Sequence, residues 1–349
     1  MKNRFSVFGL IVGLLFISQS LIAQQKKNDD PDPNKTYKYE VDSNDPANAP
    51  NLSFSIFPFY ADIYTLNYNL GYGLQGDYRL NNKLNFNFSY RGAYLDRFSK
   101  STDNLGQMHG YSRDEDKLAN SYGFGLTYYF KNDLSDHEEE ITLKTKHSGN
   151  TEINYVMDIP SKRLKLFGIR AGYEALNSSI LSGNGNIVFE GTLVTPDNSA
   201  STNFSGQGPY STYMKSGMIT VGICRTKISD LHINVEQFGE RYTAAVREVY
   251  FDVLYATGIT FSDMLVSSSN TMGAITYHAY DVNATGKSKI GFRLGYSDHF
   301  NYKFKALGTF GMELGLRPGP KDGFDNFSLL LKFGMNLSVR AGAKQPTVE

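Results

Sequence analysis

The side chains of this chain that could do chemistry are charges spaced two or four residues apart in otherwise apolar segments. Phe167, Ile169 and Tyr173 alternate with Arg170 and Glu174. Side chains alternate across a β-strand, so the apolar set and the charged set lie on opposite faces. The same parity assigns these further charges to the inward face: Arg91, Lys144, Lys146, Glu152, Asp158, His232, Glu236, Glu248, Asp252, Arg293, Lys303, Lys305, Glu313 and Lys332.

The two signs of charge are unevenly distributed along the chain. The carboxylates Glu236, Glu248 and Asp252 lie on two neighbouring segments, whereas basic residues gather on the last three segments and the early ones. If the two signs face each other across a water-filled pore, they create a transverse field that selects polar solutes. If the lumen is closed, the same charges pair directly and stiffen the wall.

The chain contains residues of the types that catalyse reactions, but they are not spaced as catalytic sites require. No two histidines have metal-ligand spacing, and no Gly-x-Ser-x-Gly nucleophile motif is present. An Asn-Ser-His phospholipase site needs a membrane-facing His and Ser on adjacent strands, for which His278 near Ser267–Ser269 is the one suggestion. We expect no catalytic residue, no metal site and no cofactor, and a lipid-modifying enzyme remains the minor alternative. The six histidines are His109, His137, His147, His232, His278 and His299.

Two further features have ordinary structural explanations. The run Asp114, Glu115 and Asp116 could bind a divalent cation or bridge lipopolysaccharide, but either role needs several convergent oxygens, so we interpret it as a solvated loop. The single cysteine, Cys224, cannot form an intrachain disulfide and suits a small position in a wall.

The element that positions the charges is an amphipathic strand about ten residues long, repeated from residue 52 to the end of the chain. In LNFNFSY, for example, Leu84, Phe86, Phe88 and Tyr90 share one face. A mean hydropathy of −0.37 is compatible with a wall that faces lipid, because only half of each strand must be apolar. Lys and Arg together number 35, as do Asp and Glu, and this zero net charge gives no reason to expect nucleic acid as a partner.

We therefore predict an all-β domain over residues 51–339, a transmembrane antiparallel up-and-down β-barrel. A closed barrel leaves no free strand edge in a bilayer. A charge on its lipid face would cost about 2–4 kcal/mol near the midplane, which is why the charges point inward. About fourteen strands can be placed, with twelve to sixteen as the range.

Connections of two lengths are expected at the two ends of the barrel. Short turns at 80–84, 159–163 and 226–230 are interpreted as periplasmic. Long polar stretches at 96–118 and 177–211 fall on the opposite side. The second contains a short apolar core, which we interpret as a hairpin folding over the barrel mouth; a protruding loop is the alternative.

The segments outside the barrel have distinct compositions. Residues 1–23 have a charged start, an apolar run and small residues at the cut, as in a cleaved signal peptide; a membrane anchor is disfavoured because the apolar run is short. Residues 24–50 are rich in Asn, Asp, Pro and Lys, which predicts a flexible periplasmic arm. A small lumen plug is the alternative for this arm. Residues 340–349 form a C-terminal tail.

The last strand carries the pattern of an assembly signal: a polar residue, a glycine and two hydrophobic residues, here Lys332, Gly334, Leu337 and Val339. With this strand and the repeated alternation, the whole chain resembles Gram-negative outer-membrane β-barrel proteins. The resemblance implies insertion by the barrel-assembly machinery and surroundings of outer-membrane lipids and lipopolysaccharide. Many such proteins end on an aromatic residue, whereas RAGAKQPTVE follows here. No stretch matches fatty-acid channels or TonB-dependent transporters.

The function expected from this resemblance is a passive channel for small polar or amphiphilic solutes across the cell outer membrane. The alternative is a non-conducting barrel that acts as a scaffold or docking partner for other envelope proteins. The two differ only in whether the lumen is open.

Overall fold

The computed structural model of the chain consists almost entirely of antiparallel β-structure. Apart from strands it contains a single short helical turn, η1 (Pro46–Asn48), among the described residues. In that part of the chain, no helix is long and apolar enough to cross a membrane. The structure describes residues 37–339 with the exception of 65–66, 97–109, 113–117, 149–150, 183–186, 195–200, 208–209, 270–274, 303–306 and 322–325.

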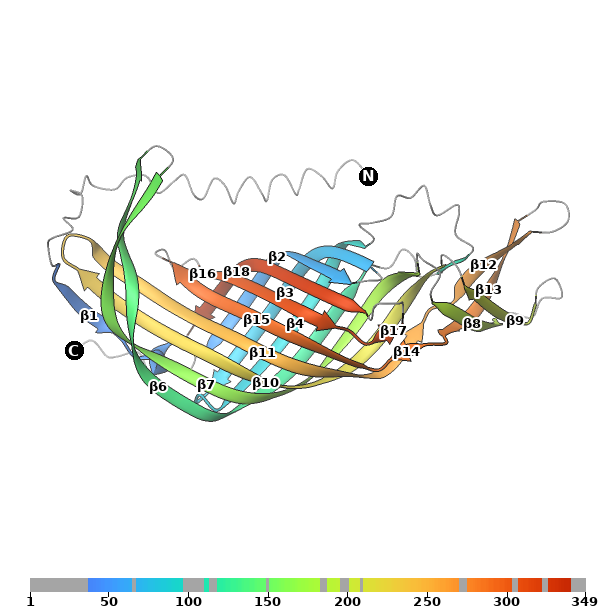
Figure 1. Ribbon diagram of the computed structural model, residues 1–349, viewed down its shortest axis with the longest axis horizontal. Coiled ribbons are helices and arrows are strands. Elements are labelled where there is room, and N and C mark those ends of the chain that lie inside the picture. The colour runs from blue at the N-terminus through green and yellow to red at the C-terminus, as the bar shows by residue number, and fades with distance from the viewer. Residues whose placement is uncertain are drawn as a thin grey trace.

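Ten strands form a closed antiparallel barrel within the described residues (Figure 1). Each strand pairs with its neighbour in chain order, and β18 pairs back onto β2, which closes the ring. The predicted antiparallel barrel is thereby confirmed as a fold. In order, the strands are β2 (Leu52–Tyr64), β3 (Asn67–Leu80), β4 (Leu84–Asp96), β6 (Asn120–Ser148), β7 (Thr151–Ser182), β10 (Tyr210–Val235), β11 (Gly239–Phe261), β15 (Ile290–Tyr302), β16 (Leu307–Leu316) and β18 (Phe327–Val339).

The barrel has ten strands rather than about fourteen because several strands are much longer than the sequence suggested. Residues 159–163 and 226–230, expected as turns, lie inside the continuous strands β7 and β10. Polar residues there do not end the strand, since their backbone groups remain paired with the neighbouring strand. The segment 270–281, expected in the wall, contributes to β13 (Ile275–Ala284), which pairs outside the ring.

The alternation of faces is maintained through irregularities in the wall. In β2, Leu52, Phe54 and Ile56 point outward, and the register then shifts between Phe57 and Tyr60, which are both buried inside. Pro58 lies in this bulge, where its missing N–H breaks no ladder bond. The bulge reverses the parity, so that the residues beyond it still present apolar side chains outward.

The barrel end that carries the start of β2 and the end of β18 has short turns and one long projection. β6 and β7 continue as a hairpin past the last contact with β4, and in Figure 1 this green hairpin crosses the outer face of β10 and β11. Its underside buries Ile141 and Ile159 against Leu231 and Ile233 of β10. We call this end the termini end.

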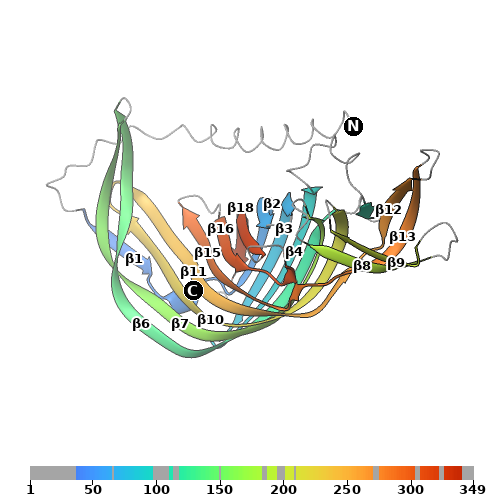
Figure 2. The same ribbon diagram turned by 45° about the vertical axis from the view of Figure 1, so that its right-hand side comes forward.

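The opposite end is extended by a small sheet built from the long loops, at the right of Figure 2. The expected hairpin within 177–211 is present in the described residues as the pair β8–β9. An apolar cluster that includes Phe189 and Met264 joins this sheet to the barrel. The added strands are β5 (Gly110–Ser112), β8 (Val188–Leu193), β9 (Asn203–Gln207), β12 (Met264–Ser269) and β13; β14 (Lys287–Ser288) and β17 (Gly319–Pro320) pair separately.

The N-terminal arm crosses the barrel mouth at the termini end. β1 (Tyr39–Ser43) pairs with the end of β10, which lies five strands from β2 in either direction around the ring. Residues 44–51 must therefore span the mouth to reach β2. The Asn44 amide anchors them, donating to Pro160 O at 3.1 Å and accepting from Ser161 Oγ at 3.1 Å and from Lys162 N at 2.8 Å. The sequence predicted an arm without regular structure, and this part of it is a strand followed by a bonded strap.

We predict that Asn44→Ala loosens the strap and β1 and exposes the start of β1 to protease. Loss of three hydrogen bonds, each contributing about 1 kcal/mol, favours local opening and should speed trypsin cleavage after Lys38 roughly tenfold or more. Timed digestion of the folded protein, followed by mass spectrometry, gives the rate. Glu40→Ala is the control, since this side chain is exposed on β1. Equal rates for the two variants would contradict the assigned anchor.

Candidate functional site

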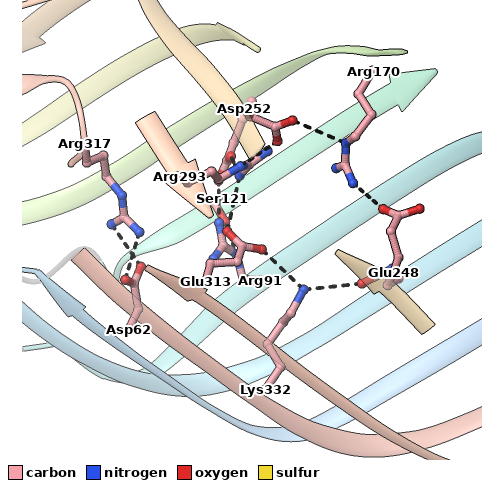
Figure 3. Close-up of polar contacts among 12 residues, drawn as sticks. Asp62, Arg91, Ser121, Arg170, Glu248, Asp252, Arg293, Glu313, Arg317 and Lys332 are labelled. Atoms are coloured by element: carbon pink, nitrogen blue, oxygen red, sulfur yellow. Dashed lines mark hydrogen bonds and ion pairs between the residues drawn. The ribbon is translucent and has the colours of Figure 1, made fainter. Parts of the chain in front are cut away.

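Eight charged side chains form a layer across the inside of the barrel (Figure 3). They come from β4, β7, β11, β15, β16 and β18, so the layer reaches every side of the lumen. Strand alternation directs each of them inward, because their neighbours along the strand face outward. We call this set the charge layer: Arg91, Arg170, Glu174, Glu248, Asp252, Arg293, Glu313 and Lys332.

Asp252 is the most enclosed member of the layer, with its side chain 1% exposed. Its carboxylate accepts from Arg293 Nε at 2.9 Å and lies 3.4 Å from Arg170 Nε. Arg170 also pairs with Glu248, whose second oxygen accepts from Thr226 Oγ1 at 2.9 Å. One carboxylate on β11 thus holds two arginines that approach it from different strands.

Arg293 connects the remaining members. Its NH1 lies 2.9 Å from Glu174 Oε2 and 3.3 Å from Glu313 Oε2. Glu174 also pairs with Arg91, and Glu313 Oε1 lies 3.6 Å from Lys332 Nζ. β15 and β7 are separated by two strands in the ring, so the Arg293–Glu174 contact bridges the lumen instead of following the wall.

A tyrosine ring supports the two central arginines. Tyr250 lies between Glu248 and Asp252 along β11 and points inward with them. The guanidinium of Arg170 lies 3.8 Å from the ring centroid, and that of Arg293 lies 5.8 Å from it. Such cation–π contacts are worth more when they are desolvated, and they fix both guanidinium groups in the centre of the lumen.

The charge layer fills much of the middle of the barrel. It contains four cations and four anions, and each member is paired with at least one of opposite sign. The space left within the layer is about 100 Å³, and the adjoining space between Met218, Leu254 and Arg317 is only about 10 Å³. A volume of about 10–15 Å³ accommodates one water molecule, so the space within the layer holds several waters and the adjoining space about one.

Further contacts link strands across the lumen at the end away from the termini. Arg317 makes a bidentate pair with Asp62, at 2.9 and 3.1 Å. Asn67 Nδ2 on β3 donates to Ser179 O on β7 at 2.7 Å, which draws together two strands that are not neighbours in the ring. Next to them, Tyr64 belongs to the apolar cluster beneath the small sheet.

A cavity of about 690 Å³ lies on the other side of the charge layer, toward the termini end. Glu248 forms part of its floor, and residues 49–51 of the strap line it near the mouth. We call this space the lumen cavity. Its wall side chains come from β2, β3, β4, β6, β10, β11, β15 and β18 and are mainly amides, hydroxyls and imidazoles, with four charged groups.

The charge layer unites eight of the residues that strand parity assigned to the lumen, whereas Glu236, Lys144 and Asp158 do not face it. Glu236 lies in the exposed turn after β10, and Lys144 and Asp158 lie on the hairpin beyond the wall. His232 lines the mouth of the lumen cavity, 3.7 Å from Asp42 of the arm. The side chains of Lys146, Glu152, Lys303 and Lys305 lie outside the described residues.

Sequence reasoning missed the Asp62–Arg317 pair. Arg317 follows the end of β16, where alternation no longer indicates a face, and Asp62 follows the bulge that reverses the parity of β2. The one feature of the sequence that could have indicated this pair is an aspartate two residues before the end of an apolar strand.

The remaining candidates are distributed as follows. Gly334 lies where β18 shifts register against β2, and a Cβ there would collide with the backbone carbonyl of Ile56. Leu337 faces outward, whereas the Val339 side chain is outside the described part. His278 is buried opposite Val266 on β12, and the side chains of Ser267–Ser269 are not described. The acidic run at 114–116 also falls outside the described ranges. Within those ranges, no group of three or more His, Cys, Asp or Glu is arranged to hold a metal.

We predict that Asp252→Asn destabilises the barrel by about 3–5 kcal/mol, because it leaves two buried arginines undercompensated. Arg247→Gln on the same strand is the control, since its guanidinium is half exposed and its pairing with Asp298 contributes about 0–1 kcal/mol. Urea titration of the detergent-solubilised protein, followed by the mobility of unboiled samples on gels, gives both midpoints. Similar midpoints for the two variants would show that the layer is hydrated.

Comparison with known proteins adds nothing to this geometry. No protein-family model matches the chain, and no curated protein does. Among solved structures, the anion-selective porin from Comamonas acidovorans is 10% identical, with 86% of this chain and 100% of that chain covered and a TM-score of 0.16. OmpT (in-vitro folded), an outer membrane protein of Vibrio cholerae, is also 10% identical, with 85% and 99% covered and a TM-score of 0.15. Superpositions this poor carry no argument, so the interpretation depends on the chain's own barrel and interior.

Proposed function

We propose that this protein is a closed, non-conducting β-barrel of the cell outer membrane, which serves as a docking platform for other envelope proteins. The observation that carries the proposal is the charge layer, in which every charge is neutralised by a direct partner instead of facing open water. The passive channel favoured by the sequence needs a continuous aqueous path, and the paired layer argues against one.

The outer surface of the wall supports the membrane location. Large apolar side chains point away from the lumen on every strand of the ring, and many are extensively exposed, including Phe124 at 60% and Ile223 at 62%. A contiguous apolar surface of this extent would drive association in water. Facing lipid, it is the expected outer band of a transmembrane barrel.

The signal-peptide pattern supports export, and a barrel with an apolar exterior supports the outer membrane as destination. Lipids and lipopolysaccharide would then surround the wall, and the barrel-assembly machinery would insert it. The structures at the two ends are the surfaces available to protein partners: the small sheet on one side, and the hairpin with the N-terminal arm on the other. We propose no enzymatic activity.

Conductance in planar lipid bilayers tests the proposal. We expect no steady current over a wide voltage range, because the paired charges that cross the lumen oppose the passage of ions. The same preparation must show faster migration when unboiled, which proves an intact barrel, and an open porin measured in parallel proves that the bilayers report channels. Reproducible open-channel current from the intact barrel would overturn the proposal in favour of a passive channel.

A further inference from the structure

The lumen cavity has no role in the function proposed above, because a closed barrel can dock partners with or without it. Its volume of about 690 Å³ lies within the range of about 300–1,000 Å³ typical of small-molecule sites. It is closed on one side by the charge layer. The remaining opening is at the termini end, beside the strap. A ligand would therefore enter from the compartment that the termini face.

Arg79 is a buried cation in the wall of this cavity. Its side chain points inward from β3, the residue is 7% exposed, and no carboxylate lies within 4 Å among the described residues. Its NH2 group reaches the strap carbonyls of Ala49 and Pro50, at 3.5 and 3.4 Å. These long bonds use a single nitrogen of a group that carries five N–H donors. The rest of the guanidinium can receive an anion.

Asp77 supplies the opposite charge from the same strand and the same face. Its carboxylate accepts from Gln75 Nε2 at 2.9 Å, and no cation within 4 Å pairs with it in the described part of the chain. Residues two apart on a strand are separated by about 7 Å. The cavity thus presents an anion and a cation from one strand, beside the carboxylates of Glu240 and Glu248, and neither Asp77 nor Arg79 has an ion-pair partner within 4 Å among the described residues.

The neutral part of the lining also lacks a partner at one point. Asn336 on β18 is 3% exposed, and its Oδ1 has no hydrogen-bond donor among the described residues. An amide acceptor enclosed in this way costs free energy unless a ligand or water donates to it. Ser53 on β2 lies in register with Asp77 on β3 and with Ser338 on β18. The two serines add hydroxyl groups along the same wall.

We propose that the lumen cavity binds a small zwitterion of dipeptide size, with its carboxylate on Arg79 and its ammonium on Asp77. A planar guanidinium recognises a carboxylate through paired N–H bonds. The backbone positions of the two residues are about 7 Å apart, so we assign the two ends of a dipeptide, not the adjacent charges of a single amino acid, to them.

Calorimetric titration of the refolded full-length protein in detergent tests this with three matched probes. Glycylglycine carries both charges, N-acetylglycylglycine lacks the ammonium, and glycylglycinamide lacks the carboxylate. We expect saturable binding of glycylglycine and at least tenfold weaker binding of the other two, corresponding to about 1.4 kcal/mol for each lost charge.

Two variants assign the two ends of the ligand. The Arg79→Gln variant should bind glycylglycine no more tightly than the same variant binds glycylglycinamide. The Asp77→Asn variant should bind glycylglycine no more tightly than the same variant binds N-acetylglycylglycine. Lys162→Gln, at an exposed position on the hairpin, is the control and should bind like the unmodified protein. If Arg79→Gln fails to fold, the binding of glycylglycine and N-acetylglycylglycine to the Asp77→Asn variant tests the inference. This variant should fold, because Asp77 is less enclosed than Arg79.

The absence of saturable binding by glycylglycine would overturn the inference and leave a cavity filled with water. Equal binding of all three probes, or binding that neither variant changes, would overturn it as well. These outcomes are independent of the bilayer measurement, since a silent barrel can bind the dipeptide or not.

Discussion

The architecture depends on one constraint: charges inside a narrow barrel must neutralise each other. Ten strands enclose too little space to hydrate eight ionised groups separately, and an uncompensated charge in such surroundings costs several kcal/mol. The arginines have the reach to satisfy this constraint, because one guanidinium can meet two carboxylates from different strands. The interior is therefore cross-linked through Asp252 and Arg293, and the positions of six strands are fixed relative to one another by contacts that no backbone ladder provides.

Strand parity predicted the wall and much of the charge layer, because a strand with an apolar outer face and a polar inner face has a strict period of two. Arg170 and Glu174 could be assigned from their neighbours alone. The same rule failed at Glu236 and Lys144, where the chain extends past the barrel wall and both of its faces meet either water or another layer of protein. Alternation of residue types shows that the two faces of a strand meet different environments, but it does not identify those environments.

Strand length was the other quantity that the sequence did not determine. β6, β7 and β10 run for 29, 32 and 26 residues, well beyond the 9–11 or so that cross a bilayer. Their outer portions are polar enough to resemble turns, yet they stay extended because the hairpin and β10 bury an apolar cluster between them. That cluster joins residues about ninety positions apart in the chain, so no local sequence pattern predicts it. Pairing across the lumen is similarly non-local, which is why the partners of Arg293 could not be named beforehand.

The strap over the mouth has a consequence for the order of events during folding. β1 precedes every barrel strand in the chain, yet Tyr39 pairs with Val235, 196 positions later (235 − 39). Its docking site does not exist until β10 has joined the wall, so the earliest part of the described chain must be among the last to settle. Closing so long a loop is entropically unfavourable until the intervening strands have shortened it. Until then the interior stays accessible from that end, and anything destined to be enclosed there can enter before the strap is laid across.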